Sequence, residues 1–517
     1  MTTTTADPKP TLDDRLPRDP AARALTEQRR RYREAHVARW DKLAGELDAH
    51  GRRMGGYYHN RLARVYGLHV GRGRRVLELG CGRGDLLAAL EPSVGVGVDF
   101  SAKMIELGRA KHPGLTFVEA DAHDPDAVAA ALGDATDEPF DFVLLSDLIN
   151  ELHDVQAVLE GLQRFCHTGT RLILNTYSRL WEQPLGVASK LNLARPMLRQ
   201  NWLATADVNN LLELAGYEPL RSFQEVLWPV RLPGVDALCN RWLVKLPGFR
   251  QFALSNFVVA RPRSVEPCPV HQPDKEPRVS VIVAARNEAG NIDSILDRTP
   301  QDLGGGTELV FVEGGSSDGT YEKIEAAIAE RPGWGAGIRL YQQDGKGKGD
   351  AVRKGFAHAS GGVLMILDAD MTVPPEDLPR FYEALRSGTG EYINGVRLVY
   401  PMEDEAMRFL NLLGNKFFSL AFSWLLGQPI KDTLCGTKVM TAENYRRLAE
   451  NRAYFGDFDP FGDFDLIFGA AKMNLKMIDL PIRYQARTYG ETNISRFRNG
   501  ATLLRMTAYA ARRLKFV

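Results

Sequence analysis

The sequence predicts an α/β protein of two domains, each built on a parallel β-sheet, and three observations predict it. The chain has 517 residues, which is too long for one hydrophobic core. Short apolar runs typical of buried strands alternate with helical segments along two long stretches. Between these stretches, residues 261–277 are rich in proline, which removes backbone donors and stiffens the chain, so they are predicted to form a linker. We therefore expect one domain over residues 24–260, opening with a charged helix, and a second over residues 278–517.

The composition and the N-terminal residues limit the functional classes. With 65 basic and 65 acidic residues the chain carries no formal net charge, which argues against nucleic acid as a partner. The five cysteines lack the spacing of a zinc site or a disulfide framework, which favours a reducing cytoplasm. Residues 1–23 are polar, contain several prolines and lack the apolar stretch of a signal peptide, so we expect a disordered tail.

Membrane contact is predicted to be peripheral at most. No stretch reaches the roughly 18 uninterrupted apolar residues that a spanning helix needs. The nearest, residues 409–430, is interrupted by Asn411, Asn415 and Lys416, and it is expected to be either a buried core helix or a helix resting on a membrane surface. The basic end at residues 511–517 is a second candidate for contact with an anionic surface. A processive membrane polysaccharide synthase, which needs spanning helices, is disfavoured.

Residues 74–90 of the first domain read as a buried strand, a glycine-rich turn and a helix. Gly80, Gly82 and Gly84 lie in the turn, where missing side chains let the backbone approach a ligand at the carboxyl end of the strand. A second predicted strand ends some 20 residues later at Asp99, where a carboxylate can accept hydrogen bonds from both hydroxyls of a ribose. A third strand ends near Asp121 and a fourth near Asp147, so acids and glycines gather at one edge of a sheet.

Two nucleotide cofactors compete for such a site. NAD sites usually show G-x-G-x-x-G with a diphosphate at the helix N-terminus. The loop here, E-x-G-x-G-x-G, resembles that of class I S-adenosylmethionine-dependent methyltransferases over roughly residues 50–260. The resemblance implies a Rossmann-like, seven-stranded sheet with S-adenosylmethionine as cofactor. It also implies these contacts: Gly80, Gly82 and Gly84 along the methionine portion, Glu78 ordering the loop and the neighbouring amine, Asp99 on the ribose, Asp121 and Ala122 beside the adenine, and Asp147 at the cofactor edge.

The methyl acceptor is not predicted. Methyl transfer depends on alignment more than on acid-base chemistry, so a general base such as His153 or Asp147 is optional. Tyr57 and Tyr58 are interpreted either as a lid over the cofactor or as packing of a helix. Four tryptophans are expected to line either an acceptor pocket or a core: Trp181, Trp202, Trp228 and Trp242.

Two aspartates end a buried strand of the second domain. Residues 364–367 are apolar and run directly into Asp368 and Asp370. Like charges so close raise each other's cost of ionisation, and a divalent cation between them offsets that cost. A D-x-D motif at the carboxyl end of a strand suits Mg²⁺ or Mn²⁺ held between the protein and a nucleotide diphosphate.

The order of motifs around this pair resembles that of family 2 glycosyltransferases with the GT-A fold. The motifs are V-S-V-I-V-x-A-x-N-E from residue 279, G-S-S-D-G-T from residue 315, G-K-G from residue 345 and then D-A-D. Three later stretches, GVRLVYPM, KDTLCGTKVM and YQARTYGETNIS, most resemble the dolichyl-phosphate-mannose-synthase-like branch, and the resemblance covers about residues 278–500. A nucleotide-diphospho-sugar is therefore the expected donor.

The resemblance also implies roles for single residues. The residues expected to bind the nucleotide-sugar are Ala285, Glu288, Glu313, Asp318, Lys348, Asp350 and Asp368. Asp368 and Asp370 are expected to bind the metal. Arg397 and Arg487 are expected to hold diphosphate or acceptor phosphate, since a planar guanidinium suits those oxyanions. The sugar and acceptor side is expected to be shaped by Asp432, Gly436 and Thr437, and Asp463 or Asp465 is a candidate general base toward a hydroxyl acceptor.

This chain departs from the family pattern at two places. The family usually shows two consecutive acids before Gly-Ser, whereas this chain has Glu313 followed by Gly314, so the base of the nucleotide is not predicted. The polyprenyl-phosphate branch usually carries Ser-Lys where this chain has Thr492 and Asn493, a loss for which Arg487 and Arg496 are candidates to compensate.

The function expected from both resemblances is bifunctional. The second domain is expected to transfer a sugar with inversion to a lipid phosphate, a glycan or a metabolite, and the first to methylate an acceptor. The alternative is that the first domain binds S-adenosylmethionine or positions substrate without turning over.

Overall fold

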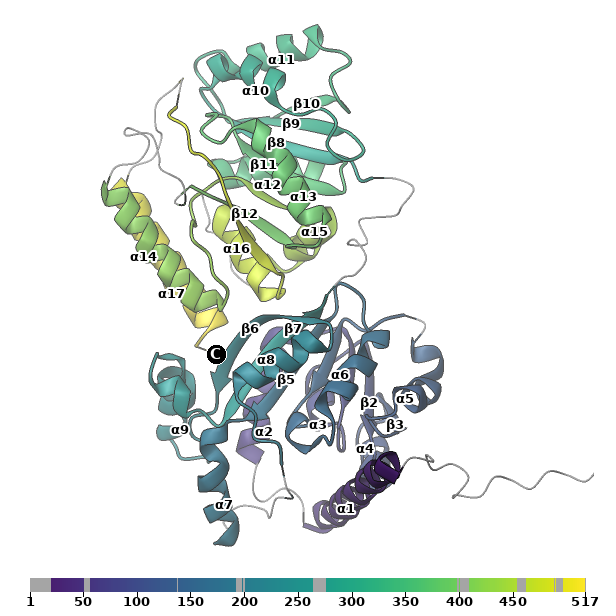
Figure 1. Ribbon diagram of the computed structural model, residues 1–517. Coiled ribbons are helices and arrows are strands. Elements are labelled where there is room, and N and C mark those ends of the chain that lie inside the picture. The colour runs from purple at the N-terminus through teal and green to yellow at the C-terminus, as the bar shows by residue number, and fades with distance from the viewer. Residues whose placement is uncertain are drawn as a thin grey trace, which may run out of the picture. The chain divides into compact units, whose positions relative to one another are not determined.

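The computed structural model describes residues 20–50, 56–136, 138–191, 198, 200–263, 276–397, 399, 409–452, 462–487, 489 and 496–516. These residues divide into two compact units, one drawn almost entirely from residues up to Pro262 and the other from Arg263 onward (Figure 1). Residues 1–19 of the predicted tail, most of the predicted linker, Thr492 and Asn493 lie outside the described residues.

The first unit contains a sheet of seven strands in the order β3-β2-β1-β4-β5-β7-β6. The strands are β1 (Arg75–Leu79), β2 (Val94–Asp99), β3 (Thr116–Glu119), β4 (Phe142–Leu145), β5 (Arg171–Tyr177), β6 (Tyr217–Glu225) and β7 (Ser255–Pro262). The first five run parallel, whereas β7 is antiparallel to β5. The predicted seven-stranded sheet is confirmed, but its strands are not all parallel as expected, since β7 pairs with β5 in the antiparallel direction.

Helices cover this sheet. They are α1 (Pro20–His50), α2 (Gly56–Val70), α3 (Asp85–Ala89), α4 (Ala102–Lys111), α5 (Pro125–Leu132), α6 (Val155–Leu162), α7 (Glu182–Lys190), α8 (Thr205–Leu214) and the short α9 (Val235–Ala237). α1 begins inside the stretch predicted as a tail, since a proline fits the first turn of a helix. The side chain of Ser101 caps α4 by accepting a hydrogen bond from the backbone N–H of Met104.

The second unit holds another seven-stranded sheet, in the order β10-β9-β8-β11-β13-β12-β14. The strands are β8 (Val279–Ala285), β9 (Thr307–Glu313), β10 (Ile338–Gln342), β11 (Val363–Asp368), β12 (Tyr392–Val396), β13 (Lys438–Thr441) and β14 (Met477–Pro481). Strands β8 to β11 are parallel, and β13 lies antiparallel to both β11 and β12. This mixed sheet again corrects the expectation of parallel strands alone.

Helices pack on both faces of the second sheet, because successive side chains of a strand point to opposite faces. Val281 and Val283 of β8 belong to one apolar core and Ile282 to the other. The first core is covered by α10 (Ile292–Arg298), α11 (Thr320–Glu330) and α13 (Leu378–Arg386). The second is covered by α12 (Lys348–His358), α14 (Phe409–Leu426), α15 (Ala442–Glu450), α16 (Asp463–Lys472) and α17 (Arg496–Leu514).

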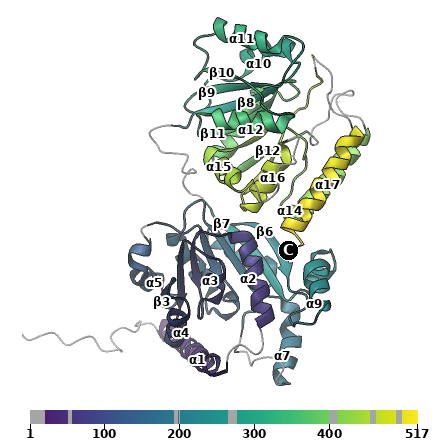
Figure 2. The same cartoon turned by 180° about the vertical axis from the view of Figure 1, so that it is seen from behind.

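Helix α14 covers most of residues 409–430, the stretch expected to be either a core helix or a surface helix. It lies beside α17 in both views (Figures 1 and 2). Phe418 and Phe422 are buried in the core, whereas Phe417 and Leu420 are 56% and 74% exposed. The helix therefore packs through one face and leaves apolar side chains on the other. No helix within the described ranges is long and apolar enough to cross a bilayer.

Candidate functional sites

The glycine-rich loop after β1 has the backbone that only glycine adopts readily. The φ angles of Gly80, Gly82 and Gly84 are 66°, 53° and 75°. A Cβ on Gly80 would lie 2.8 Å from Leu148, and one on Gly84 would lie 2.5 Å from Phe117, whereas one on Gly82 would meet nothing within 4 Å. Gly82 therefore presents bare backbone to open space, as a ligand-binding loop requires.

Asp99 fixes this loop from the end of β2. Its carboxylate accepts hydrogen bonds from the backbone N–H of Gly82 at 2.8 Å and of Ser101 at 2.9 Å. Burial raises the pKa of Asp99 to about 6, with Glu151 and Asp41 adding to the effect and the two backbone donors opposing it. Asp99, the residue predicted to bind the ribose, is therefore held in one orientation beside the glycine loop.

Glu78 lies in β1 directly before the loop and is 2% exposed. Its Oε2 atom has no hydrogen-bond partner among the described residues, and burial raises its pKa well above the ordinary value. A buried carboxylate oxygen without a donor is a costly arrangement that a cationic ligand group would relieve.

The loops after β3 and β4 are held by α1, a contact that the sequence did not predict. Arg33 of α1 lies 3.0 Å from the carboxylate of Asp121, which also accepts a hydrogen bond from His123 Nδ1 at 2.9 Å. Burial would raise the pKa of Asp121, but these donors outweigh it and lower the pKa. Trp40 donates to Glu151 at 2.8 Å. Ala122, beside Asp121, packs against the core.

Asp147 follows β4 and sits in a buried polar cluster. Its φ of 56° is unusual for a residue other than glycine. Tyr58 donates a hydrogen bond to Asp147 Oδ1 at 2.9 Å, and the side-chain amide of Asn175 donates to the same oxygen. Burial raises the pKa of Asp147 to about 6, against the effect of these two donors. Tyr58 is buried, which is consistent with its interpretation as helix packing.

The two aspartates after β11 are each held by a different cation. Lys348, the first residue of α12, forms an ion pair with Asp368. Arg487 Nη2 lies 2.7 Å from Asp370 Oδ2, and the hydroxyl of Thr372 donates to Asp370 Oδ1 at 2.8 Å. Burial would raise the pKa of Asp368, but Lys348 outweighs it and lowers the pKa. Each carboxylate is therefore paired with a cation.

Arg487 also joins a third carboxylate to the pair. Its Nη1 lies 3.4 Å from Glu288, whose pKa burial raises to about 7 while Arg487 opposes the shift. The guanidinium thus lies between Asp370 and Glu288. Within the described ranges, no group of three or more His, Cys, Asp or Glu side chains is arranged to hold a metal ion.

The predicted nucleotide residues organise the loops around this site. Asp318 accepts hydrogen bonds from the backbone N–H of Ala289 and Thr320, both at 3.1 Å. Asp350 accepts from the N–H of Gly345 at 2.8 Å and so closes the loop before α12. Glu313 is buried and accepts from the N–H of Ser316 at 2.5 Å. Ala285, at the end of β8, accepts a hydrogen bond from the N–H of Gly314 at 2.9 Å.

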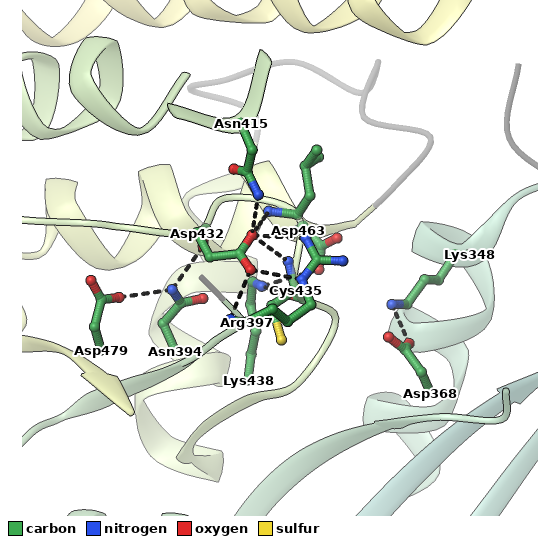
Figure 3. A network of polar contacts seen from close by, with 11 residues as sticks. Lys348, Asp368, Asn394, Arg397, Asn415, Asp432, Cys435, Lys438, Asp463 and Asp479 are labelled. Atoms are coloured by element: carbon green, nitrogen blue, oxygen red, sulfur yellow. Dashed lines mark hydrogen bonds and ion pairs between the residues drawn. The ribbon is translucent and has the colours of Figure 1, made fainter. Parts of the chain in front are cut away.

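Arg397 is held by a buried carboxylate. Its Nε and Nη2 atoms donate to the two oxygens of Asp432 at 2.7 and 2.9 Å, and Asn415 of α14 donates to Asp432 at 2.9 Å (Figure 3). Burial would raise the pKa of Asp432, but the charge of Arg397 holds it down at about 2. Tyr484 lies under the guanidinium at 5.1 Å. Asp432 therefore positions Arg397, a pairing that the sequence did not predict.

The two candidate bases lie in different surroundings. Asp463 is 3.4 Å from Lys438 and lies within the network of Figure 3. Burial would lower the pKa of Lys348, but Asp368 and then Asp463 outweigh it and raise the pKa. Asp465 is instead paired with Arg452 at 2.8 Å.

Gly436 contacts the same centre. A Cβ on this residue would overlap Asp368 Oδ2 and Lys348 Nζ. Thr437, the next residue, is buried, with a hydroxyl that has no hydrogen-bond partner among the described residues. Gly436 and Lys348 therefore lie beside Asp368, whereas Asp465 is paired with Arg452.

Comparisons with known proteins assign the two halves separately. Residues 280–443 match the family described as glycosyl transferase family 2, and residues 30–222 match the family described as methyltransferase domain. Glycosyltransferase AglJ from Haloferax volcanii is 28% identical over 227 residues, which is 44% of this chain and 69% of the relative. A dolichyl-phosphate hexose transferase from the same organism is also 28% identical over 227 residues, or 44% of this chain and 90% of the relative.

Other similarities are more distant or cover only part of the relative, so they say less about this chain. Another curated relative is 34% identical over 114 residues, but the match covers only 31% of its length. The crystal structure of glucosyl-3-phosphoglycerate synthase from Mycobacterium tuberculosis with Mn²⁺, uridine diphosphate and glucosyl-3-phosphoglycerate is 20% identical and has a TM-score of 0.34. It covers 46% of this chain and 80% of that chain, a similarity too distant to transfer a ligand.

Proposed function

We propose that the chain is a bifunctional transferase, because residues 280–443 match glycosyl transferase family 2 and residues 30–222 match a methyltransferase domain. The second domain transfers a sugar from a nucleotide-diphospho-sugar to a polyprenyl phosphate, with inversion at the anomeric carbon. The first domain transfers a methyl group from S-adenosylmethionine. The first domain spans residues 24–260 and the second spans residues 278–517. The observation that carries the proposal is the pair Asp368 and Asp370, each balanced by its own cation at the end of β11.

A divalent metal fits this pair. Mg²⁺ and Mn²⁺ prefer oxygen ligands, and in nucleotide sites one or two carboxylates suffice because substrate phosphates and water complete the shell. Asp368 and Asp370 would hold the ion, which when bound stabilises negative charge on the leaving diphosphate. Lys348 and Arg487 are placed to share that charge, since they already pair with the same carboxylates.

The acceptor decides whether a base is needed. A polyprenyl phosphate is already ionised, so its oxygen attacks without losing a proton, and the name of the dolichyl-phosphate hexose transferase supports this acceptor class. A hydroxyl acceptor would need a base, for which Asp463 and Asp465 are the candidates; Asp463 lies 3.4 Å from Lys438 and Asp465 lies 2.8 Å from Arg452. Arg397, fixed by Asp432, would orient a phosphate group.

The first domain would bind S-adenosylmethionine through the loop after β1. Glu78 Oε2 fits the cofactor amine as a buried acceptor without a donor, and Asp99 would accept from the ribose hydroxyls. Asp121 and Ala122 would border the adenine, and Asp147 would face the methyl acceptor. The bound cofactor supplies an activated methyl group, so the protein's task is to align the nucleophile behind it.

The first experiment measures nucleoside diphosphate released from UDP-, GDP-, CDP- and dTDP-sugars with Mn²⁺ or Mg²⁺ and a short polyprenyl phosphate. We expect metal-dependent turnover of one donor, and at least a 100-fold loss in Asp370→Ala, since misplacing a ligand by an ångström costs that much. Asp377→Ala, which removes a partly buried carboxylate paired with the exposed Arg380, is the matched control. Turnover that ignores metal and survives Asp370→Ala would overturn the proposal.

Replacing Arg487 with glutamine is expected to tighten Mn²⁺ binding about tenfold while slowing sugar transfer. The guanidinium pairs with Asp370 and Glu288, so a cation that binds Asp370 must compete with it for that carboxylate. Calorimetric titration of Mn²⁺ measures the affinity without turnover. Arg298→Gln, which removes a bidentate pair with Glu376 elsewhere in the domain, should leave Mn²⁺ affinity unchanged. An unaltered affinity in Arg487→Gln would contradict this competition.

Binding of S-adenosylmethionine is expected to weaken as the pH falls below about 6. Only the ionised carboxylate of Asp99 accepts both ribose hydroxyls, and its pKa in the fold is about 6 instead of 3.8. The dissociation constant should therefore rise about tenfold for each pH unit below 6. The sign is opposite for the ligand-free fold, which should gain stability as the pH falls from 6 toward 4. Titration calorimetry between pH 8 and 5 checks this, and Asp99→Asn should bind weakly with a flat profile.

The same titrations separate turnover from binding alone. A module that binds S-adenosylmethionine but yields no methylated product from the glycosylated lipid would replace methyl transfer by a positioning role for the first domain. Failure to bind at any pH would remove the cofactor assignment itself.

A further inference from the structure

A segment of the first unit turns its apolar side chains outward. Residues 235–245 form one irregular helical stretch, made of α9, a π-helical turn and a 3₁₀ turn. Asn240, Val244 and Lys245 face the interior, while Val235, Leu238, Trp242 and Leu246 recur at helical spacing on the exposed face. The exposed apolar side chains of residues 227–252, which we call the apolar segment, are Trp228, Val230, Leu232, Val235, Leu238, Trp242, Leu246, Phe249 and Phe252.

This orientation is held by buried polar contacts. Glu225, 4% exposed, is paired with Lys245 and with Arg61 of α2. The side chain of Asn240 accepts from the backbone N–H of Trp228 at 2.8 Å and donates to its carbonyl at 2.6 Å. Breaking a buried ion pair is costly, so these contacts fix which side of the segment faces inward. The opposite side therefore faces the solvent.

Cations border the apolar segment. Arg231, Arg241 and Arg250 are exposed, and the guanidinium of Arg241 lies 5.8 Å from the ring of Trp242. The one acid in residues 227–252, Asp236, is half-buried. Tryptophan beside arginine on an apolar face is the composition that favours the boundary between lipid headgroups and acyl chains.

Helix α7 extends the same surface. Leu180, Val187 and Leu191 are exposed in and next to α7, with Lys190 beside them. The indole of Trp181 donates to the carbonyl of Phe252 at 2.9 Å, which ties the start of α7 to the end of the apolar segment. α7 and α9 lie at the same end of the first unit in both views (Figures 1 and 2).

We propose that the apolar segment, together with α7, docks the methyltransferase domain on a membrane containing anionic lipids. Its aromatic and aliphatic side chains enter the headgroup region, and its three arginines pair with lipid phosphates. A second copy of this chain is a poorer occupant, because a symmetric contact would set these arginines against one another without exposed acids to pair them. This docking does not depend on the proposed reactions.

Vesicle flotation of the full chain tests the proposal. Binding is expected to vesicles with 30% phosphatidylglycerol and to fall about 100-fold in Arg231→Gln/Arg241→Gln/Arg250→Gln, since each cation near an anionic surface contributes about 1 kcal/mol. Arg164→Gln, which removes an exposed arginine elsewhere in the same unit, should leave flotation unchanged. Equal binding to neutral and anionic vesicles, or no flotation, would overturn the proposal.

A second measurement locates the contact. Lipids brominated on their acyl chains should quench the fluorescence of the wild type, and Trp228→Phe/Trp242→Phe should lose that quenching while still floating, because phenylalanine keeps the apolar area. Quenching that persists in the double variant would assign the contact to another surface. If both tryptophans became shielded from solvent when the protein concentration was raised without lipid, a second copy of the chain would be the occupant.

Discussion

Asp432→Ala is expected to cost the glycosyltransferase domain about 3 to 5 kcal/mol of unfolding free energy, the range found when one partner of a buried ion pair is removed. Asp432 is 0% exposed and is bound by both arms of Arg397 and by Asn415. Without it, a guanidinium stays in the interior with no anion to balance it. The free energy is best measured by hydrogen exchange of peptides from β12 and β13 in increasing urea, which reports on this domain alone.

Two further variants make the interpretation specific. Glu383→Ala removes an exposed pair with Arg386 on α13 and should cost less than about 0.5 kcal/mol. Arg397→Met/Asp432→Leu replaces both charges with apolar side chains and should recover much of the lost stability while remaining inactive. A loss below about 1 kcal/mol in Asp432→Ala would mean that the pair does not hold this part of the domain.

Gly436→Ala is expected to lower the efficiency of sugar transfer at least about 100-fold, the usual cost of a displacement of an ångström at a reacting centre. The added methyl group would overlap Asp368 Oδ2 and Lys348 Nζ, so the ion pair must open or the strand end must shift. Steady-state release of nucleoside diphosphate at saturating metal measures the effect.

The matched control for this variant is Gly414→Ala. Gly414 lies in α14, and a Cβ there would meet nothing within 4 Å, so activity should stay within about twofold and helix stability should rise slightly. If Gly436→Ala were as active as Gly414→Ala, the space between Asp368 and Lys348 would not be the space that the donor uses.

The sequence predicted the parts of both sites that are local. The glycine loop followed by Asp99 and the D-x-D motif after an apolar run each lie within one strand and the turn beyond it, so pattern and chemistry sufficed. The roles assigned to these residues stay predictions until ligands are measured. The two sheets were predicted in kind but not in detail, because nothing local indicates that β7 and β13 return antiparallel.

Long-range partners were not predictable in the same way. Arg487 reaches Asp370 across 117 residues, and Arg33 reaches Asp121 from a helix that read only as highly charged. An arginine is most often a solvated surface charge, and its sequence neighbours do not reveal which carboxylate it meets. The apolar segment was hidden for a related reason, since the same tryptophans could line a core.

The contacts of helix α1 bear on the turnover rate of the proposed methyl transfer. Arg33, Trp40 and Asp41 tie it to the loops after β3, β4 and β2, the loops that border the proposed cofactor site. If the first domain binds S-adenosylmethionine as proposed, opening of these contacts during cofactor exchange would be a step that can limit turnover. Shortening or tagging the N-terminus would thus change how fast the enzyme cycles without touching a residue that meets substrate.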